Sequence, residues 1–348
     1  MRFHIENDAQ DSIVGWLAPD NPLAVSRVAV ALDGRRVAEV PAAVAMPDLK
    51  AWGWHSTGIC GFLANEEAVP GITAAKRVEL YDADTNTLLY RRPLRDDLIQ
   101  GRVVLVNPGL EQSTAVQNAL FHHFQMSYFS IERMPEETLV TIVNGLMTSL
   151  LVAGRVAYAR YEAFFYKNAF TTCVLVGDAY AELARRILWL RARAAMAASP
   201  AQAWRAHDLR GPIAFAAALP LEDANGLRKA FRSVEQDVWN FLSSPLTRTL
   251  ACKLPDERLE AFHPSQALEA LSRFQVVGHE AFFDAYAATV FSKLGLADAP
   301  PAGPETSAEV EALAETLRRV PTARALIDYD VVLSEAVRGI VAQQWSGG

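Results

Sequence analysis

This chain of 348 residues has few cysteines, lacks long apolar runs and has no excess of positive charge. Its three cysteines, Cys60, Cys173 and Cys252, lie far apart among apolar neighbours, which argues against a disulfide framework or a metal site and predicts core thiols. Apolar stretches stop well short of the roughly 18 residues that span a bilayer. The N-terminal MRFHIENDAQD lacks the basic and apolar regions of a secretory signal. We therefore expect a cytoplasmic protein without a transmembrane segment.

The charge balance is acidic. The chain has 33 Lys and Arg against 40 Asp and Glu, a formal net charge of −7. This balance argues against broad binding to nucleic acid or to an anionic membrane. Any anionic ligand would have to be held by a local group of cations.

Hydrophobic residues make up 51 % of the chain, enough for two domains. We expect a small all-β sandwich over residues 1–95 and an α/β domain over 96–348. Within the first, Asp33-Gly34 is a hairpin signal. Short β-type runs separated by turn residues predict strands over residues 13–17, 28–32, 37–40 and 78–81.

The first 90 residues also resemble β-sandwich modules attached to bacterial glycosyltransferases, through the pattern IVGWLAPDNP, VAVALDGRRVAEV and GICGF. Such an accessory module contacts a sugar or a partner. The alternative is that its aromatic side chains, Trp16, Trp52, Trp54 and Phe62, mostly fill the core.

After Arg92, helical patterns alternate with short apolar runs, which predicts an α/β layer with a large helical share. The expected strands cover residues 103–106, 172–176 and 274–277. The expected helices cover residues 113–124, 135–148, 155–167, 179–197, 223–241, 265–273, 279–294, 307–319 and 330–343. The dipeptide Gly278-His279 precedes one of these helices, so His279 is expected beside an N-cap rather than in catalysis.

Residues 102–124 form the most informative segment. An apolar strand is stopped by Asn107-Pro108-Gly109, and a helix follows, with Ser113 or Thr114 as its N-cap. A strand, a short loop and a helix present backbone N–H groups to an anion, as in phosphate-binding loops. The loop chemistry differs, because it contains the carboxylate of Glu111 and no cation.

Several stretches resemble the nucleotide-dependent carbohydrate sulfotransferases, which have a P-loop-like fold. They are VLVNPGLEQSTAVQNAL, FTTCVLVGDAYAELARRILWL, WNFLSSPLTRTLACKL, ALEALSRFQVVGHEAFFDAYAATVFSKLGL and IDYDVVLSEAV, and together they cover roughly residues 100 to 345. The resemblance implies an α/β, sulfotransferase-like (P-loop NTPase-like) domain.

The resemblance also implies a donor, 3′-phosphoadenosine 5′-phosphosulfate, held at the helix start and at a second strand end. The residues at the matching positions are Gln112, Ser113, Thr114, Asp178, Arg185 and Arg248. The family's loop Lys is replaced by Gly109, and its second-motif Arg and Ser by Gly177 and Arg185. Each lost charge-assisted hydrogen bond costs about 1.5–3 kcal/mol, so the usual donor should bind badly unless other cations replace these groups.

The same resemblance implies an acceptor site after Gly154, where the family often carries Gly-His, and it makes three residues there candidate acceptor contacts. Arg155 could face the cleft and hold an acidic sugar or a phosphate, or it could bridge at a helix start. Arg160 and Tyr161 follow it, and Arg160 could instead be a solvated or ion-paired helix residue.

Candidate general bases follow the loop. His122 or His123 could abstract a proton from a sugar hydroxyl near neutral pH, and Glu132 is an alternative base. Each could instead be a structural or solvated side chain. The resemblance thus leaves two hypotheses: a transferase of bacterial surface-polysaccharide assembly acting on a sugar hydroxyl, or an inactive relative that binds a glycan or an assembly partner.

Overall fold

The computed structural model describes residues 1–348 except 22–23, 94–97, 111–113, 200–208, 255 and 346–348. Contacts between Cα atoms divide the chain into two units. Unit 1 comprises residues 1–103, 120–152 and 164–170, and unit 2 comprises residues 104–119, 153–163 and 171–348. The boundary expected after residue 95 stays a prediction.

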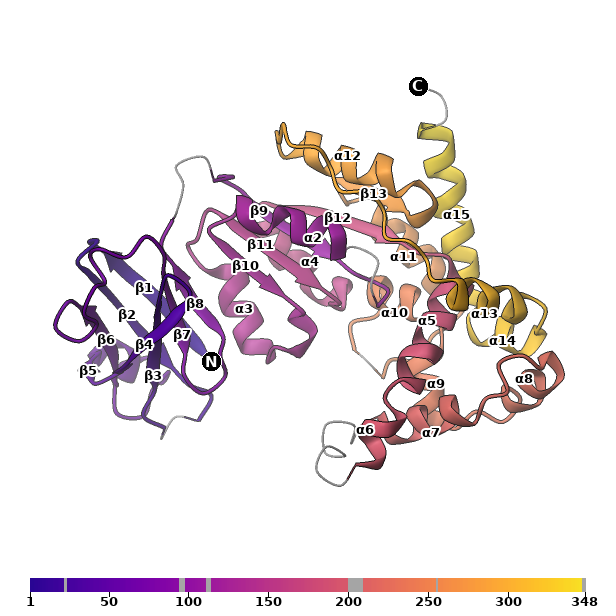
Figure 1. Ribbon diagram of the computed structural model, residues 1–348, viewed down its shortest axis with the longest axis horizontal. Helices are drawn as coiled ribbons and strands as arrows, with labels where there is room; N and C mark the ends of the chain where they lie inside the picture. Colours follow the sequence, from indigo (N-terminus) through magenta and orange to yellow (C-terminus); the bar gives the residue numbers. More distant parts are fainter. Residues whose placement is uncertain (22–23, 94–97, 111–113, 200–208, 255, 346–348) are drawn as a thin grey trace. The chain divides into compact units, whose positions relative to one another are not determined.

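Two four-stranded antiparallel sheets form a β-sandwich at the start of unit 1 (Figure 1). The first, in spatial order, contains β1 (Arg2–Asp8), β2 (Ser12–Ala18), β6 (Ile59–Asn65) and β5 (Val44–Ala45). The second contains β4 (Arg35–Pro41), β3 (Arg27–Leu32), β7 (Val78–Asp82) and β8 (Leu88–Arg91). The short helix α1 (Pro47–Ala51) precedes β6. All four expected strands are confirmed, each within two residues.

Asp33 and Gly34 join β3 to β4 with φ values of 47° and 81°. Two successive positive φ values are the geometry of a type I′ turn, so the expected hairpin is confirmed. Strands β1, β5, β6 and β8 were not expected from the sequence. In β1 (RFHIEND) polar and apolar residues alternate from Arg2 to Glu6, but this short alternation contains only two apolar positions, Phe3 and Ile5.

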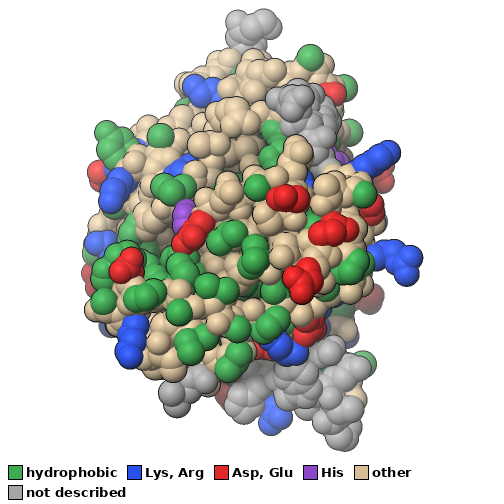
Figure 2. Space-filling view, turned by 90° about the vertical axis from the view of Figure 1, so that its left-hand side faces the viewer, with side chains coloured by type: hydrophobic (Ala, Val, Ile, Leu, Met, Phe, Trp, Pro, Cys, Tyr) green, Lys and Arg blue, Asp and Glu red, His purple; other side chains and the backbone are tan. Residues whose placement is uncertain are grey.

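The exposure of two tryptophans corrects the expectation that the aromatic side chains of the sandwich mostly fill its core. Phe62 lies in the sandwich core, but Trp52 is 61 % exposed and Trp54 is 37 % exposed. Figure 2 shows hydrophobic side chains spread over the face that the sandwich presents. On the outer side of β5 and β6, Val44, Ile59 and Leu63 are also exposed, since they occupy alternating positions of the paired strands.

A five-stranded sheet has the order β10-β11-β9-β12-β13. Its strands are β9 (Arg102–Val106), β10 (Met126–Phe129), β11 (Leu150–Gly154), β12 (Phe170–Val176) and β13 (Val276–His279). Strands β12 and β13 pair in parallel, with Cys173 opposite Val276 and Val176 opposite His279. The expected α/β class is therefore confirmed in its general form, a combination of helices and sheets. The expected strands at 103–106 and 172–176 are confirmed, and the one at 274–277 begins two residues later.

Helices make up most of the rest of the chain (Figure 1). Those up to residue 198 are α2 (Thr114–Leu120), α3 (Glu136–Asn144), α4 (Tyr158–Lys167), α5 (Ala179–Arg191) and α6 (Ala194–Ala198), with 3₁₀ turns η1 (Phe121–His123) and η2 (Ile131–Arg133). Those after residue 208 are α7 (Arg210–Ala218), α8 (Ala224–Ala230), α9 (Gln236–Leu242), α10 (Pro245–Ala251), α11 (His263–Leu271), the 3₁₀ turn η4 (Glu280–Phe282), α12 (Phe283–Lys293), α13 (Ala308–Arg318), α14 (Pro321–Leu326) and α15 (Asp328–Trp345).

The expected helix over 223–241 is in fact two helices, α8 and α9. The buried residues Leu227, Phe231, Val238 and Leu242 keep near-helical spacing across the break, so the sequence looks like one amphipathic helix. Helix α5 lies against α7 and α13, and these elements share one apolar core. This packing fixes the first turn of α5 at the end of β12, where the candidate site begins.

Candidate functional site

The carboxyl ends of β9, β11, β12 and β13 and the loops that follow them all belong to unit 2. Strand β9 lies between β11 and β12, so the chain leaves β9 towards one side of the sheet and leaves β12 towards the other. Ligands of open α/β sheets bind at such a switch point, outside the carboxyl ends of the strands. The loops after β9 and β11 are joined there by a 2.9 Å hydrogen bond from Asn107 N to Gly154 O.

A carboxylate of the chain itself occupies part of the loop after β9. The backbone N–H of Leu110 donates to Glu182 Oε2 over 3.2 Å. Glu182 comes from the first turn of α5 and is completely buried. Its other oxygen accepts a 2.7 Å hydrogen bond from Arg186 Nε, and Arg186 is only 2 % exposed. The Glu182 carboxylate thus occupies the position at which the corresponding N–H of a phosphate-binding loop would contact its ligand.

The second expected donor contact, Asp178, caps α5. Its side chain accepts hydrogen bonds from two N–H groups of the first turn and pairs with Arg318 at 2.7 Å. Burial acts to raise the pKa of Asp178, but the hydrogen bonds from Arg318 and from those N–H groups outweigh it and hold the pKa below its ordinary value. Asp178 is therefore an ionised N-cap.

Arg185 lies between two carboxylates. Its Nη2 donates to Glu280 over 2.8 Å, and its Nη1 lies 3.9 Å from Glu182. Glu280 also accepts a 2.9 Å hydrogen bond from the backbone N–H of Asp178. Burial raises the pKa of Glu280, although Arg185 acts in the opposite direction. The cation expected to contact a phosphate is thus engaged by acidic side chains.

These groups border a pocket of about 680 Å³. Its charged lining consists of five carboxylates and three guanidinium groups: Asp178, Glu280, Glu305, Glu311, Glu315, Arg185, Arg318 and Arg338. An excess of negative charge repels a ligand that carries phosphate and sulfate groups.

His279 lies in the same pocket, at the end of β13. It is itself the N-cap of η4, where its side chain accepts from Ala281 N, whereas the sequence predicted a place beside the N-cap. Its Nε2 lies 3.1 Å from the Ser334 hydroxyl. Burial lowers the pKa of His279 to about 4, so the ring is neutral at pH 7.

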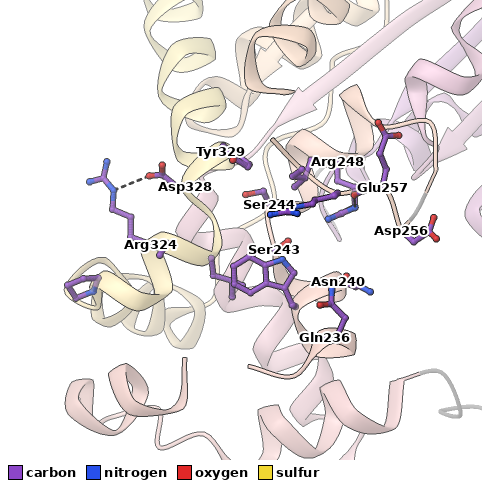
Figure 3. A pocket seen from close by; sticks show the side chains of 16 residues that line it. Gln236, Asn240, Ser243, Ser244, Arg248, Asp256, Glu257, Arg324, Asp328 and Tyr329 are labelled. Carbon is purple, nitrogen blue, oxygen red and sulfur yellow. Dashed lines mark hydrogen bonds and ion pairs between the residues drawn. The ribbon is translucent and has the colours of Figure 1, made fainter. Parts of the chain in front are cut away.

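A second pocket, of about 860 Å³, lies between α9, α10, the segment 256–259 and the α14–α15 turn (Figure 3). Its lining includes the half-exposed indole of Trp239 together with Gln236, Asn240, Asp328, Tyr329 and Arg248. Arg248 Nη1 donates to the carbonyl oxygen of Glu257 over 2.6 Å. The expected donor contacts are therefore divided, with Asp178 and Arg185 in one pocket and Arg248 in the other.

Asp330, from the first turn of α15, holds one wall of the second pocket. Its carboxylate accepts from the backbone N–H groups of Leu246 and Thr247, at 3.0 and 2.7 Å, and so caps α10. Asp330 is completely buried, and burial raises its pKa to about 6.

The three candidate bases lie in unit 1. His122 and His123 lie on η1, and His122 is exposed with its ring 4.9 Å from that of Phe121. Glu132 is exposed on η2. The donor contacts that the structure describes belong to unit 2.

The remaining candidates are spread along the chain. Arg155 is half-buried directly after β11, and Thr114 is the first residue of α2. Arg160 is exposed with its guanidinium 5.8 Å from the ring of Tyr161, which is itself buried. Gln112 and Ser113 lie outside the described residues.

Sequence reasoning missed the contacts of Glu182 with Leu110, of Glu280 with Arg185 and of Arg318 with Asp178, because the partners are distant in the chain. One local signal was present: Glu182 precedes Arg186 by four residues, the spacing of a helical ion pair. Trp239 and Tyr329 were missed because nothing local distinguishes a pocket aromatic from a core one.

Comparisons of the sequence with known families and proteins assign the chain to no family. No family model matches the chain, and no curated protein matches its sequence. Among the helices that the structure describes, none combines the length and apolar character needed to cross a membrane.

Proposed function

We propose that the chain is a sulfotransferase-like protein that has given up its nucleotide donor and binds a glycan, as a partner in bacterial surface-polysaccharide assembly. The observation that carries this proposal is the hydrogen bond between Leu110 N and Glu182. A donor phosphate would have to displace a buried carboxylate that Arg186 also holds. Such a displacement breaks a buried ion pair, at a cost of about 3–5 kcal/mol.

The pocket beside Trp239 supports the glycan part of the proposal. Sugars present apolar C–H faces that stack on an indole and hydroxyl groups that pair with amides, carboxylates and guanidinium groups. The pocket offers an aromatic surface in Trp239, amides in Gln236 and Asn240, and charge in Arg248 and Asp328. Pockets that combine apolar surface with a few converging polar groups are the usual sites for small ligands.

Calorimetric titration with adenosine 3′,5′-bisphosphate, at low and at moderate salt, tests the loss of the donor. We expect no heat at millimolar ligand from a folded sample. Micromolar binding that Arg248→Ala weakens would contradict the proposal. It would support the second candidate instead, a transferase that takes its group from this donor and delivers it to a sugar hydroxyl.

Glycan binding is tested by titrating neutral and acidic oligosaccharide fragments of bacterial polysaccharides. We expect binding that Trp239→Ala and Asn240→Ala abolish. Trp52→Ala is the matched control, because Trp52 is also exposed but belongs to the β-sandwich. Loss of binding in Trp52→Ala alone would move the glycan site to the sandwich and contradict the role of this pocket.

A further inference from the structure

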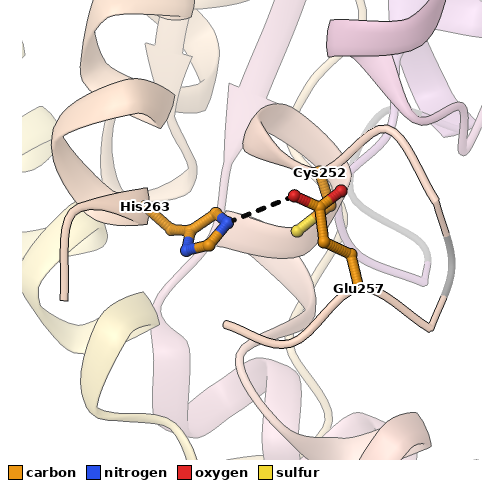
Figure 4. Close-up of side chains that lie close together, drawn as sticks. All are labelled: Cys252, Glu257 and His263. Atoms are coloured by element: carbon orange, nitrogen blue, oxygen red, sulfur yellow. Dashed lines mark ion pairs between the residues drawn. The ribbon is translucent and has the colours of Figure 1, made fainter. Parts of the chain in front are cut away.

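Three side chains with different metal-binding atoms meet beside the second pocket. Cys252 is the C-cap of α10, His263 begins α11, and Glu257 lies on the segment between them. The Cys252 sulfur, a carboxylate oxygen of Glu257 and a ring nitrogen of His263 all lie within 4.8 Å of one another. Figure 4 shows the three side chains converging from these elements.

The imidazole of His263 lacks a hydrogen-bond partner on its inner nitrogen. His263 is 2 % exposed, and its buried Nε2 has no hydrogen-bond partner among the described residues. The nearest carboxylate oxygen, Glu257 Oε1, is 3.6 Å away, which is too long for a hydrogen bond. Two ligand atoms bound tetrahedrally to one zinc ion at 2.0–2.1 Å lie about 3.4 Å apart, so this separation fits a shared ion better.

Backbone groups orient both side chains for this role. Glu257 Oε2 accepts from Lys253 N at 2.9 Å and from Leu254 N at 3.4 Å, which leaves Oε1 directed at His263. On the far side of the ring, His263 Nδ1 lies 2.7 Å from Glu260 N and 3.2 Å from Glu260 O. Without metal, Nδ1 accepts from the N–H and Nε2 carries the proton. With metal on Nε2, the proton moves to Nδ1 and is donated to Glu260 O, the arrangement that orients most histidine ligands, and the Glu260 N–H gives up its hydrogen bond to Nδ1.

We propose that Cys252, Glu257 and His263 bind one Zn²⁺ ion through Sγ, Oε1 and Nε2. A sulfur, nitrogen and oxygen donor set selects zinc over Mg²⁺ or Ca²⁺, which take oxygen ligands. Cys252 binds as the thiolate and releases its proton to solvent. Three protein ligands leave the fourth position to water. Glu257 is 37 % exposed and lines the 860 Å³ pocket, which gives the ion its route of entry. This inference does not rest on the proposed function.

Metal content and cobalt spectroscopy of the full chain test the site. After equilibration with Zn²⁺ and removal of free metal, we expect one zinc ion per chain. Co²⁺ should give a thiolate-to-cobalt charge-transfer band and the visible bands of tetrahedral cobalt. Cys252→Ser should remove the charge-transfer band, whereas Cys173→Ser, at another buried cysteine, should retain it.

Glu257→Gln and His263→Gln should weaken zinc binding in competition with a chromogenic chelator. The loss should exceed the roughly 10–100-fold seen when only an outer, ligand-orienting contact is removed. If substitution of the buried His263 prevents folding, the zinc affinity of Glu257→Gln still tests the site. A folded wild-type chain that binds no zinc would overturn the proposal. So would zinc that Cys252→Ser and Glu257→Gln bind as tightly as the wild type does.

Discussion

The buried carboxylate of Asp330 accepts a 2.7 Å hydrogen bond from the backbone N–H of Thr247. This bond joins two helices that are more than 80 residues apart in the chain, since α10 begins at Pro245 and α15 at Asp328. It places a titratable group inside the wall of the second pocket. The stability of that wall should therefore depend on pH.

Because of Asp330, the free energy of unfolding should fall as pH rises. Burial raises its pKa from 3.8 to about 6, against the backbone N–H groups and Arg186, so between pH 4 and 6 the folded chain holds a proton that the unfolded chain has lost. The free energy of unfolding of the wild type, relative to Asp330→Asn, should fall by roughly 3 kcal/mol across this window and stay level above it. Urea denaturation of both proteins at several pH values measures this difference. A difference that grows with pH would contradict the assignment.

His279 should act in the opposite direction. Burial lowers its pKa from 6.5 to about 4, with Asp178 raising it and Arg338 lowering it. The unfolded chain therefore binds a proton between pH 4 and 6.5 that the folded chain does not, and stability rises with pH there. Relative to His279→Gln, the wild type should gain roughly 3 kcal/mol between pH 4 and 6.5. NMR titration is a direct check, because a His279 ring that titrates near its ordinary pKa would refute the prediction.

Glu182→Gln should destabilise unit 2 strongly. The substitution leaves the guanidinium of Arg186, 2 % exposed, without its carboxylate, and breaking such a buried pair costs about 3–5 kcal/mol. Glu315→Gln is the matched control: it breaks another pair of the same helical spacing, with Arg319, in which both side chains are more than half exposed. That loss should stay below about 1 kcal/mol. Chemical denaturation measures both losses of stability. If they are equal, the role of Glu182 as a structural anion is contradicted.

Gly34→Ala should destabilise the β-sandwich by about 1 kcal/mol. A Cβ at Gly34 meets no atom within 4 Å, so the cost comes from its φ of +81° alone. Gly339→Ala is the control with the opposite sign. It also meets nothing within 4 Å but lies inside α15, where alanine should stabilise by about 0.5–1 kcal/mol. Thermal unfolding of both variants tests the pair, and a stabilising Gly34→Ala would show that the type I′ turn is absent.

Local signals were enough for much of the fold. The Asp33-Gly34 hairpin and the strand 103–106 each depend on residues that are neighbours in the chain. Strand β11 was missed because its short apolar run, LLVAG, has no period that distinguishes it from a buried helix segment. Helices α10 and α14 were missed although each has a proline in its first turn, because they are only seven and six residues long.

The candidate site was harder to foresee. Arg185 could be named from the sequence, but its partner Glu280 lies 95 residues later, and no local pattern links the two. The same holds for Arg318, whose partner Asp178 lies 140 residues earlier. Whether a cation meets a ligand or a carboxylate of its own chain depends on tertiary contacts, which periodicity does not encode.

The cap that Asp330 places on α10 also sets an order of assembly. Any product of synthesis or proteolysis that ends before residue 330 leaves the N–H groups of Leu246 and Thr247 without this acceptor. The wall of the second pocket would then lack its anchor, whatever the state of the β-sandwich. During translation, this pocket must wait for α15 to emerge.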